Sequence, residues 1–145
     1  MAASEADAKD EVETLVNTLV PFARRMLERH GAFVPFGASV DAEGEIKMVA
    51  ADAEAVGPEP SAADAARLIE SGLRVAAIAG EIRASGICTD VRIDGPDGEV
   101  EAISVALEHI DRDPLRVLVS YEVTPSGEHG FGKPIAAPGE SRIFA

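Results

Sequence analysis

The sequence contains no tryptophan, and aromatic residues amount to only 4% of its 145 positions. Proteins that bind single-stranded nucleic acid stack the bases on aromatic side chains, and few such side chains exist here. The core must be aliphatic, because hydrophobic residues still make up 46% of the chain. That fraction is typical of a globular protein and excludes a disordered one.

Basic residues are also scarce, since 13 lysines and arginines stand against 26 acidic residues and give a formal net charge of −13. A field of this sign repels phosphate groups and anionic lipids, so we expect no nucleic-acid partner and no membrane partner. In one interpretation the acidity provides solubility, and in another it attracts a basic protein partner. Net charge alone does not distinguish the two.

Cysteine occurs once, at Cys88, so no disulfide can form within the chain. The first residues, MAASEADAKDEVE, are acidic and lack the basic and apolar stretches of a signal peptide. No apolar run approaches the roughly 20 residues that span a membrane. These three features predict a protein of a reducing cytoplasm.

The chain has the length of one domain, and we expect a single domain over residues 1–145 in which residues 1–10 form an irregular leader. Apolar residues recur at spacings of three and four over residues 12–30, which predicts a helix. Pro21 lies inside this pattern. It predicts a kink, or a helix that starts near Thr18, because proline cannot donate a hydrogen bond to the preceding turn.

Two strands and a second helix are predicted next. Residues 33–40 and 45–51 have strand character, with a tight turn between them. The first of these strands must lie at an edge or begin after Pro35, which has no N–H to pair. Ser61 predicts the start of a second helix, and Gly86 predicts its end.

The stretch 86–124 organises the rest of the chain. It reads as three consecutive strands with period-two alternation and short turns, which is typical of an antiparallel sheet with one buried face. We predict an α+β fold of order α-β-β-α-β-β-β, with an antiparallel sheet of five to six strands and both helices on one face. Segments 135–137 and 142–145 are candidates for further short strands. The alternation assigns Ile87, Thr89, Val91 and Ile93 to the core, and Cys88, Asp90, Arg92, Glu108 and Glu122 to a solvated face.

A phosphate-binding motif is matched in part by GEHGFGK, residues 127–133. A phosphate-binding loop of the form GxxxxGK also needs a serine or threonine after the lysine, a strand before it and a helix after it. Here Pro134 takes the place of the hydroxyl residue, and the motif follows an antiparallel meander. We therefore interpret the segment as a glycine-rich loop.

No catalytic set emerges from the remaining reactive residues. The three histidines, His30, His109 and His129, show no metal-ligand spacing. Cys88 has Asp90 beside it, and a neighbouring acid makes a thiol a poor nucleophile. No GxSxG elbow is present. The sequence predicts no catalytic residues, no metal and no cofactor, and it favours a protein that is not an enzyme.

Several stretches resemble small bacterial hypothetical proteins of unknown function. They are GAFVPFG at residues 31–37, DVRI at 90–93, AISVALEH at 102–109 and PGE at 138–140. The resemblance spans most of the chain and implies a bacterial protein, but it brings no activity with it. Separately, the predicted order of elements is similar to that of roadblock and profilin-like modules, which are dimerising or scaffold domains; this is an analogy of topology alone.

Three functional hypotheses follow. The first is a non-catalytic domain that binds a protein partner or itself. The second is a small-molecule-binding protein or enzyme that uses the polar residues Asp90, Arg92, Glu108 and His109, with the loop 127–133 as a lid. The third is an acidic immunity or inhibitor protein directed at a basic toxin.

Overall fold

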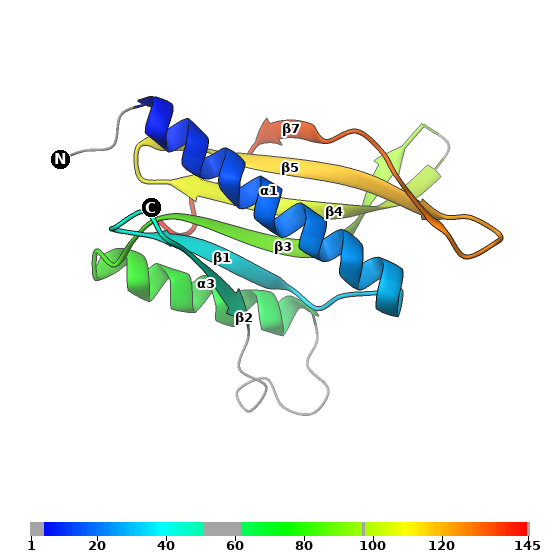
Figure 1. The fold of residues 1–145 in the computed structure, drawn as a ribbon, viewed down its shortest axis with the longest axis horizontal. Coiled ribbons are helices and arrows are strands. Elements are labelled where there is room, and N and C mark those ends of the chain that lie inside the picture. The colour runs from blue at the N-terminus through cyan, green and yellow to red at the C-terminus, as the bar shows by residue number, and fades with distance from the viewer. Residues whose placement is uncertain (1–4, 51–61, 97, 145) are drawn as a thin grey trace.

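The computed structural model describes residues 5–50, 62–96 and 98–144. Among these residues, two helices and seven strands form an α+β fold around one sheet (Figure 1), so the predicted fold class is confirmed. In chain order the elements are α1 (Glu5–His30), β1 (Phe36–Asp41), β2 (Ile46–Ala50), α3 (Ala62–Ile78), β3 (Ile82–Gly95), β4 (Gly98–His109), β5 (Arg112–Val123), β6 (His129–Phe131) and β7 (Ile135–Pro138).

The sheet has the strand order β2-β1-β3-β4-β5-β6, and β7 also pairs with β5. Every pairing among the described strands is antiparallel. Strands β3, β4 and β5 form the predicted meander and are the longest, with 14, 12 and 12 residues. Strands β6 and β7 lie one after the other along the outer edge of β5, pairing with Tyr121–Val123 and Leu115–Leu118 respectively.

Helix α1 begins earlier than the sequence predicts. It starts at Glu5, within the predicted leader, and residues 1–4 lie outside the described residues. Its first turns are held by the full burial of Ala8 and by an ion pair between Lys9 and Glu13 at 3.8 Å. These contacts make the first turns part of the domain.

Pro21 neither ends nor restarts α1, which is one helix through this position. Its ring is exposed, whereas Leu19 and Ala23 on either side are completely buried. A proline inside a helix causes a loss of about 3 kcal/mol, because one backbone hydrogen bond is missing and the ring clashes with the preceding turn. Burying each large apolar side chain of the helix contributes about 1.5–3 kcal/mol, so the packed face of α1 outweighs that loss.

The two helices cover opposite faces of the sheet, contrary to the predicted arrangement with both on one face. A Cβ atom at Gly86 would meet Leu19 of α1 at 2.6 Å, whereas one at Gly37 would meet Ile69 of α3 at 3.4 Å. Ala38 pairs directly with Gly86, and adjacent residues of a strand point to opposite faces. Figure 1 shows α1 lying across β3, β4 and β5, with α3 along the β1 and β2 side of the sheet.

This arrangement reverses the predicted faces of β3. Cys88 points towards α1 and is completely buried beside Val105, its partner on β4. Ile87 and Thr89 point towards the α3 side. Because both faces are covered, neither parity of β3 is a fully solvated one, and alternation of polarity does not identify the core. The large cluster under α1 comprises Leu15, Leu19, Val20, Ala23, Leu27, Phe36, Ala38, Val40, Ala84, Cys88, Ile103, Val105, Leu107, Val117, Val119 and Tyr121, and the smaller one under α3 comprises Ile69, Leu73, Ile82 and Ile143.

Helix α3 ends at Ile78 and not at the predicted Gly86. Gly80 has a φ of +73° and terminates the helix, a conformation that glycine adopts without strain. The chain then enters β3 at Ile82. The predicted start of this helix at Ser61 lies outside the described residues.

Strand β1 begins at Phe36, directly after Pro35 as predicted, and lies between β2 and β3. The turn that follows it is also confirmed. Oδ1 of Asp41 accepts the backbone N–H groups of Glu43 and Glu45, both at 2.9 Å, and Gly44 has a φ of +88°. The carboxylate of Asp41 therefore fixes the β1–β2 connection.

Candidate functional site

The four residues predicted for a polar sheet face are not brought together. Glu108 and His109 are both buried, but they follow one another on β4 and so point to opposite faces. Asp90 lies on the α1-facing parity, where it accepts a hydrogen bond from Tyr121 at 2.7 Å. Arg92 is exposed and lies 3.9 Å from a carboxylate oxygen of Glu101. No single surface contains all four residues.

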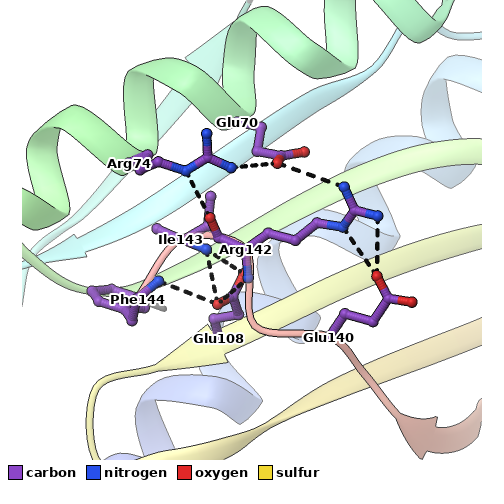
Figure 2. A network of polar contacts seen from close by, with 7 residues as sticks. All are labelled: Glu70, Arg74, Glu108, Glu140, Arg142, Ile143 and Phe144. Carbon is purple, nitrogen blue, oxygen red and sulfur yellow. Dashed lines mark hydrogen bonds and ion pairs between the residues drawn. The ribbon is translucent and has the colours of Figure 1, made fainter.

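Glu108 anchors the end of the chain (Figure 2). Its Oε1 accepts the backbone N–H groups of Arg142 and Ile143 at 3.0 Å and that of Phe144 at 3.3 Å, while Oε2 also lies 3.0 Å from the Ile143 nitrogen. The sequence makes residues 142–145 a candidate for a short strand, but residues 142–144 are irregular. The carboxylate accepts hydrogen bonds from backbone N–H groups that, in a strand, would donate to the carbonyl groups of a neighbouring strand.

Side chains fasten this C-terminal segment, residues 139–144, to α3. Arg74 donates through Nε to the backbone oxygen of Arg142 at 2.9 Å and through Nη2 to Glu70 at 2.7 Å. Arg142 lies 3.7 Å from Glu70 and 3.0 Å from Glu140. Figure 2 shows these groups closing over the sheet between α3 and the C-terminal segment. Ile143 completes the attachment by joining the apolar cluster under α3.

A cavity of about 360 Å³ lies beneath this network. The sheet supplies its floor, α3 one wall and the C-terminal segment another. The floor residues are mostly small, which is why space remains between the layers. The lining consists of Ala66 and Glu70 from α3, Ser85, Ile87, Thr89, Ser104, Ala106, Glu108 and Arg116 from the sheet, and Pro138, Gly139, Glu140, Arg142 and Ile143 from the end of the chain.

On the α1 face, His109 belongs to a separate buried cluster. Its Nε2 lies 2.8 Å from Oε1 of Glu11, and its Nδ1 accepts the backbone N–H of Asp111 at 3.0 Å. Because Nδ1 is an acceptor, the proton of the neutral ring is on Nε2 and is donated to Glu11. Arg83 donates to the other oxygen of Glu11 through Nε at 2.8 Å and also through Nη2. Burial raises the pKa of Glu11, but the hydrogen bonds from Arg83 and His109 outweigh this and leave the pKa below its ordinary value.

Tyr121 and Asp90 form a third polar contact near the far end of α1. Burial, followed by the hydrogen bond to Asp90, raises the pKa of Tyr121 above its ordinary value. Burial also raises the pKa of Asp90, although the Tyr121 hydroxyl partly opposes it. The ring of Phe131 lies 6.2 Å from that of Tyr121, and the guanidinium of Arg24 lies 4.3 Å from the Phe131 centroid. The edge strand β6 is thereby tied to α1.

Cys88 is unsuited to nucleophilic chemistry in this fold. Its side chain has no exposed surface, and burial, followed by the charge of Asp90, raises the pKa of the thiol to about 12. A reactive cysteine needs access and a lowered pKa, and this one has neither. The prediction that Cys88 is a poor nucleophile is therefore supported.

The segment 127–133 has no phosphate-loop geometry. Gly127 has a φ of +87° in the turn after β5, and His129–Phe131 form the short edge strand β6. The next element is the strand β7 and not a helix. Without a helix N-terminus behind the glycines, the backbone cannot cradle a phosphate as a phosphate-binding loop does.

Long-range contacts account for the residues that sequence reasoning missed. Glu11 lies 98 residues before His109, and Arg142 lies 34 residues after Glu108. Neither pair has a local spacing signal. An acidic residue at a buried position of a predicted strand is the one sequence signal for such a residue. Glu108 could have been recognised from this signal only if the buried face of β4 had been known.

Within residues 5–50, 62–96 and 98–144, no group of three or more histidine, cysteine or acidic side chains is placed to hold a metal ion. In the same part of the chain, neither helix is long and apolar enough to cross a membrane. Comparison with family models, with curated proteins and with solved structures finds no match to this chain.

Proposed function

We propose that this protein is a non-catalytic association domain that binds a second copy of itself through α3 and the neighbouring edge strand β2. The exposed apolar side chains of α3 carry this proposal. Val75 is 68% exposed and Ile78 is 81% exposed, and Leu68 lies two helical turns before Val75 on the same side. Exposed apolar side chains gathered on one side of a helix are a common feature of surfaces that bind protein.

The edge of strand β2 is a second reason to place the interface on this side of the molecule. Strand β2 stands at one end of the sheet order and, among the described residues, pairs only with β1. Val49 of β2 packs on the apolar cluster beneath α3, so the strand edge and the helix are continuous. A two-fold axis beside β2 would pair two copies of this strand in antiparallel fashion and bring the two α3 helices close together.

A non-catalytic role is supported by the internal engagement of three polar residues, His109, Glu108 and Tyr121. Both ring nitrogens of His109 are in contacts with Glu11 and Asp111. Glu108 receives backbone N–H groups, and Tyr121 donates to Asp90. A general base or acid must have a polar atom free to reach a substrate, and these groups are occupied within the fold.

Sedimentation equilibrium over a wide concentration range tests the proposal. We expect the wild type to dimerise, Val75→Glu to be monomeric, and Val123→Glu to dimerise as the wild type does. Val123 on β5 is a matched control because it is an exposed valine, 54% accessible, on another element. A monomeric wild type at all concentrations would overturn self-association, and a dimeric Val75→Glu would overturn the assignment of the interface to α3.

A further inference from the structure

We infer that the cavity between α3, the sheet and the C-terminal segment binds a small hydroxylated carboxylate, with Arg116 as its anchor. This inference does not depend on self-association, because the cavity lies beneath α3 and not on its exposed side. At about 360 Å³ the cavity falls at the lower end of the range of small-molecule sites, roughly 300–1,000 Å³. It has room for roughly twelve groups the size of a water molecule.

The floor of the cavity carries hydroxyl groups where a sheet face under a helix usually carries large apolar side chains. Ser85 is 1% exposed and Ser104 is 4% exposed, and Thr89 is half-buried beside them. A buried hydroxyl is unfavourable unless it forms hydrogen bonds. Ser104 accepts from Nε of Arg116 at 2.9 Å, but within the described residues the hydroxyls of Ser85 and Thr89 have no partner. They are available to a ligand.

Arg116 provides the positive charge that the other lining residues do not neutralise. The carboxylate of Glu108 is occupied by backbone N–H groups, and Glu70 is bound by Arg74 and Arg142. Arg142 also pairs with Glu140. Among the described residues, Arg116 has no carboxylate within ion-pair distance, and only its Nε is hydrogen-bonded. Its Nη atoms remain free to bind a carboxylate through two parallel hydrogen bonds.

The remaining lining decides between classes of anion. Glu70 and Glu140 on the walls are paired with Arg142, whereas Glu108 on the floor has no arginine or lysine partner among the described residues. A doubly charged phosphate would therefore meet repulsion from Glu108 that a singly charged carboxylate meets less strongly. The same acidic side chains can accept hydrogen bonds from hydroxyl groups of a ligand. A small hydroxy acid satisfies the guanidinium, the serine and threonine hydroxyls, and the wall carboxylates together.

Titration calorimetry and amide NMR at constant ionic strength test this inference with the singly charged hydroxy acids glycerate and gluconate, and with inorganic phosphate as a comparison. We expect at least one hydroxy acid to bind saturably and to shift the amides of Ser85, Ser104 and Arg116, and phosphate to bind more weakly. Arg116→Gln should weaken binding at least about tenfold, because charge-assisted hydrogen bonds are lost. Ser85→Val should also weaken it, by removing a donor and filling space.

Arg92→Gln is the matched control, since Arg92 is an exposed arginine on β3 outside the cavity lining. Thermal unfolding establishes that each variant is folded. The inference is overturned if no hydroxy acid binds saturably, if Arg116→Gln binds as well as the wild type, or if Arg92→Gln loses binding to the same extent. The monomerising variant Val75→Glu should retain the ligand, which separates this result from the outcome for self-association.

Discussion

Glu108 and His109 are neighbours in the chain, yet they bind partners on opposite sides of the sheet. Glu108 holds the backbone of residues 142–144 on the α3 face, and His109 holds Glu11 of helix α1 on the other. Both are buried near the end of β4. This one dipeptide therefore connects the first helix, the central sheet and the end of the chain.

Replacing Glu108 with alanine should destabilise the protein by about 2–3 kcal/mol, because a charged acceptor of several backbone N–H groups is lost. Urea unfolding measures the change. Glu122→Ala is the control, as Glu122 is an exposed glutamate on the neighbouring strand β5. Glu108→Ala should also make the C-terminal segment a substrate for carboxypeptidase in the native protein. Equal stability of the two variants would contradict the anchoring role.

The contribution of Glu11 to stability should disappear in acid. Its pKa is lower in the folded protein than its ordinary value of 4.5, so its stabilising contribution is complete above that value and is lost as the pH falls through the folded pKa. We expect the difference in free energy of unfolding between wild type and Glu11→Gln to be largest near neutral pH and to shrink below about pH 4.5. Urea titrations at a series of pH values measure it.

Glu13→Gln serves as the comparison for this experiment, because Glu13 is an exposed carboxylate on the same helix and is paired with Lys9 at the surface. Such a surface pair contributes at most about 1 kcal/mol. A difference for Glu11→Gln that is the same at every pH would show that the cluster with Arg83 and His109 does not act through the charge of Glu11.

The thiol of Cys88 should not react with a disulfide reagent in the native protein. Its side chain is completely buried, so the reagent cannot reach the sulfur. Its pKa is raised to about 12, so little of the reactive thiolate is present. In denaturant the single cysteine should react completely, and the absorbance of the released thiolate measures both cases. Native reaction at the denatured rate would show that the sheet beneath α1 opens readily.

Two glycine-to-alanine substitutions should change stability in opposite directions. A Cβ at Gly37 would lie 2.6 Å from the backbone oxygen of Gly86, which cannot move without disturbing the β1–β3 pairing. Gly37→Ala should therefore cost about 1–3 kcal/mol. Gly72 lies within α3, and such a Cβ there would meet no atom within 4 Å beyond its chain neighbours and the local backbone of the helix. Alanine at this position should stabilise by about 0.5–1 kcal/mol. Thermal unfolding of dilute protein distinguishes the two.

Local signals in the sequence were sufficient for the class of fold. Alternation with period two and short turns predicted the β3–β4–β5 meander. Pro35 predicted that β1 is an edge strand or begins after this proline, and the second alternative is the one observed. The turn at Asp41–Gly44 was also readable, since one aspartate and one glycine satisfy it. Each of these features depends on residues within a few positions of one another.

The end of α3 shows where local signals become ambiguous. Gly80 and Gly86 are both acceptable helix terminators, and the residues between them suit either a helix or a strand. Pairing with β1 and β4 decides the matter, because Ala84 and Ser85 join both neighbours in the sheet. Those partner strands are distant in sequence, so a local sequence pattern contains no information about pairing with them.

The sequence by itself determined an aliphatic, acidic α+β domain with an antiparallel meander, because composition and periodicity depend on nearby residues. Only the tertiary structure decided that α1 and α3 cover opposite faces, that Glu108 binds the end of the chain, and that Arg116 lines a cavity. The physical reason is that a buried polar group is stable only with partners, and here those partners come from elements far apart in the chain. These partners come close together only when both helices have packed on the sheet.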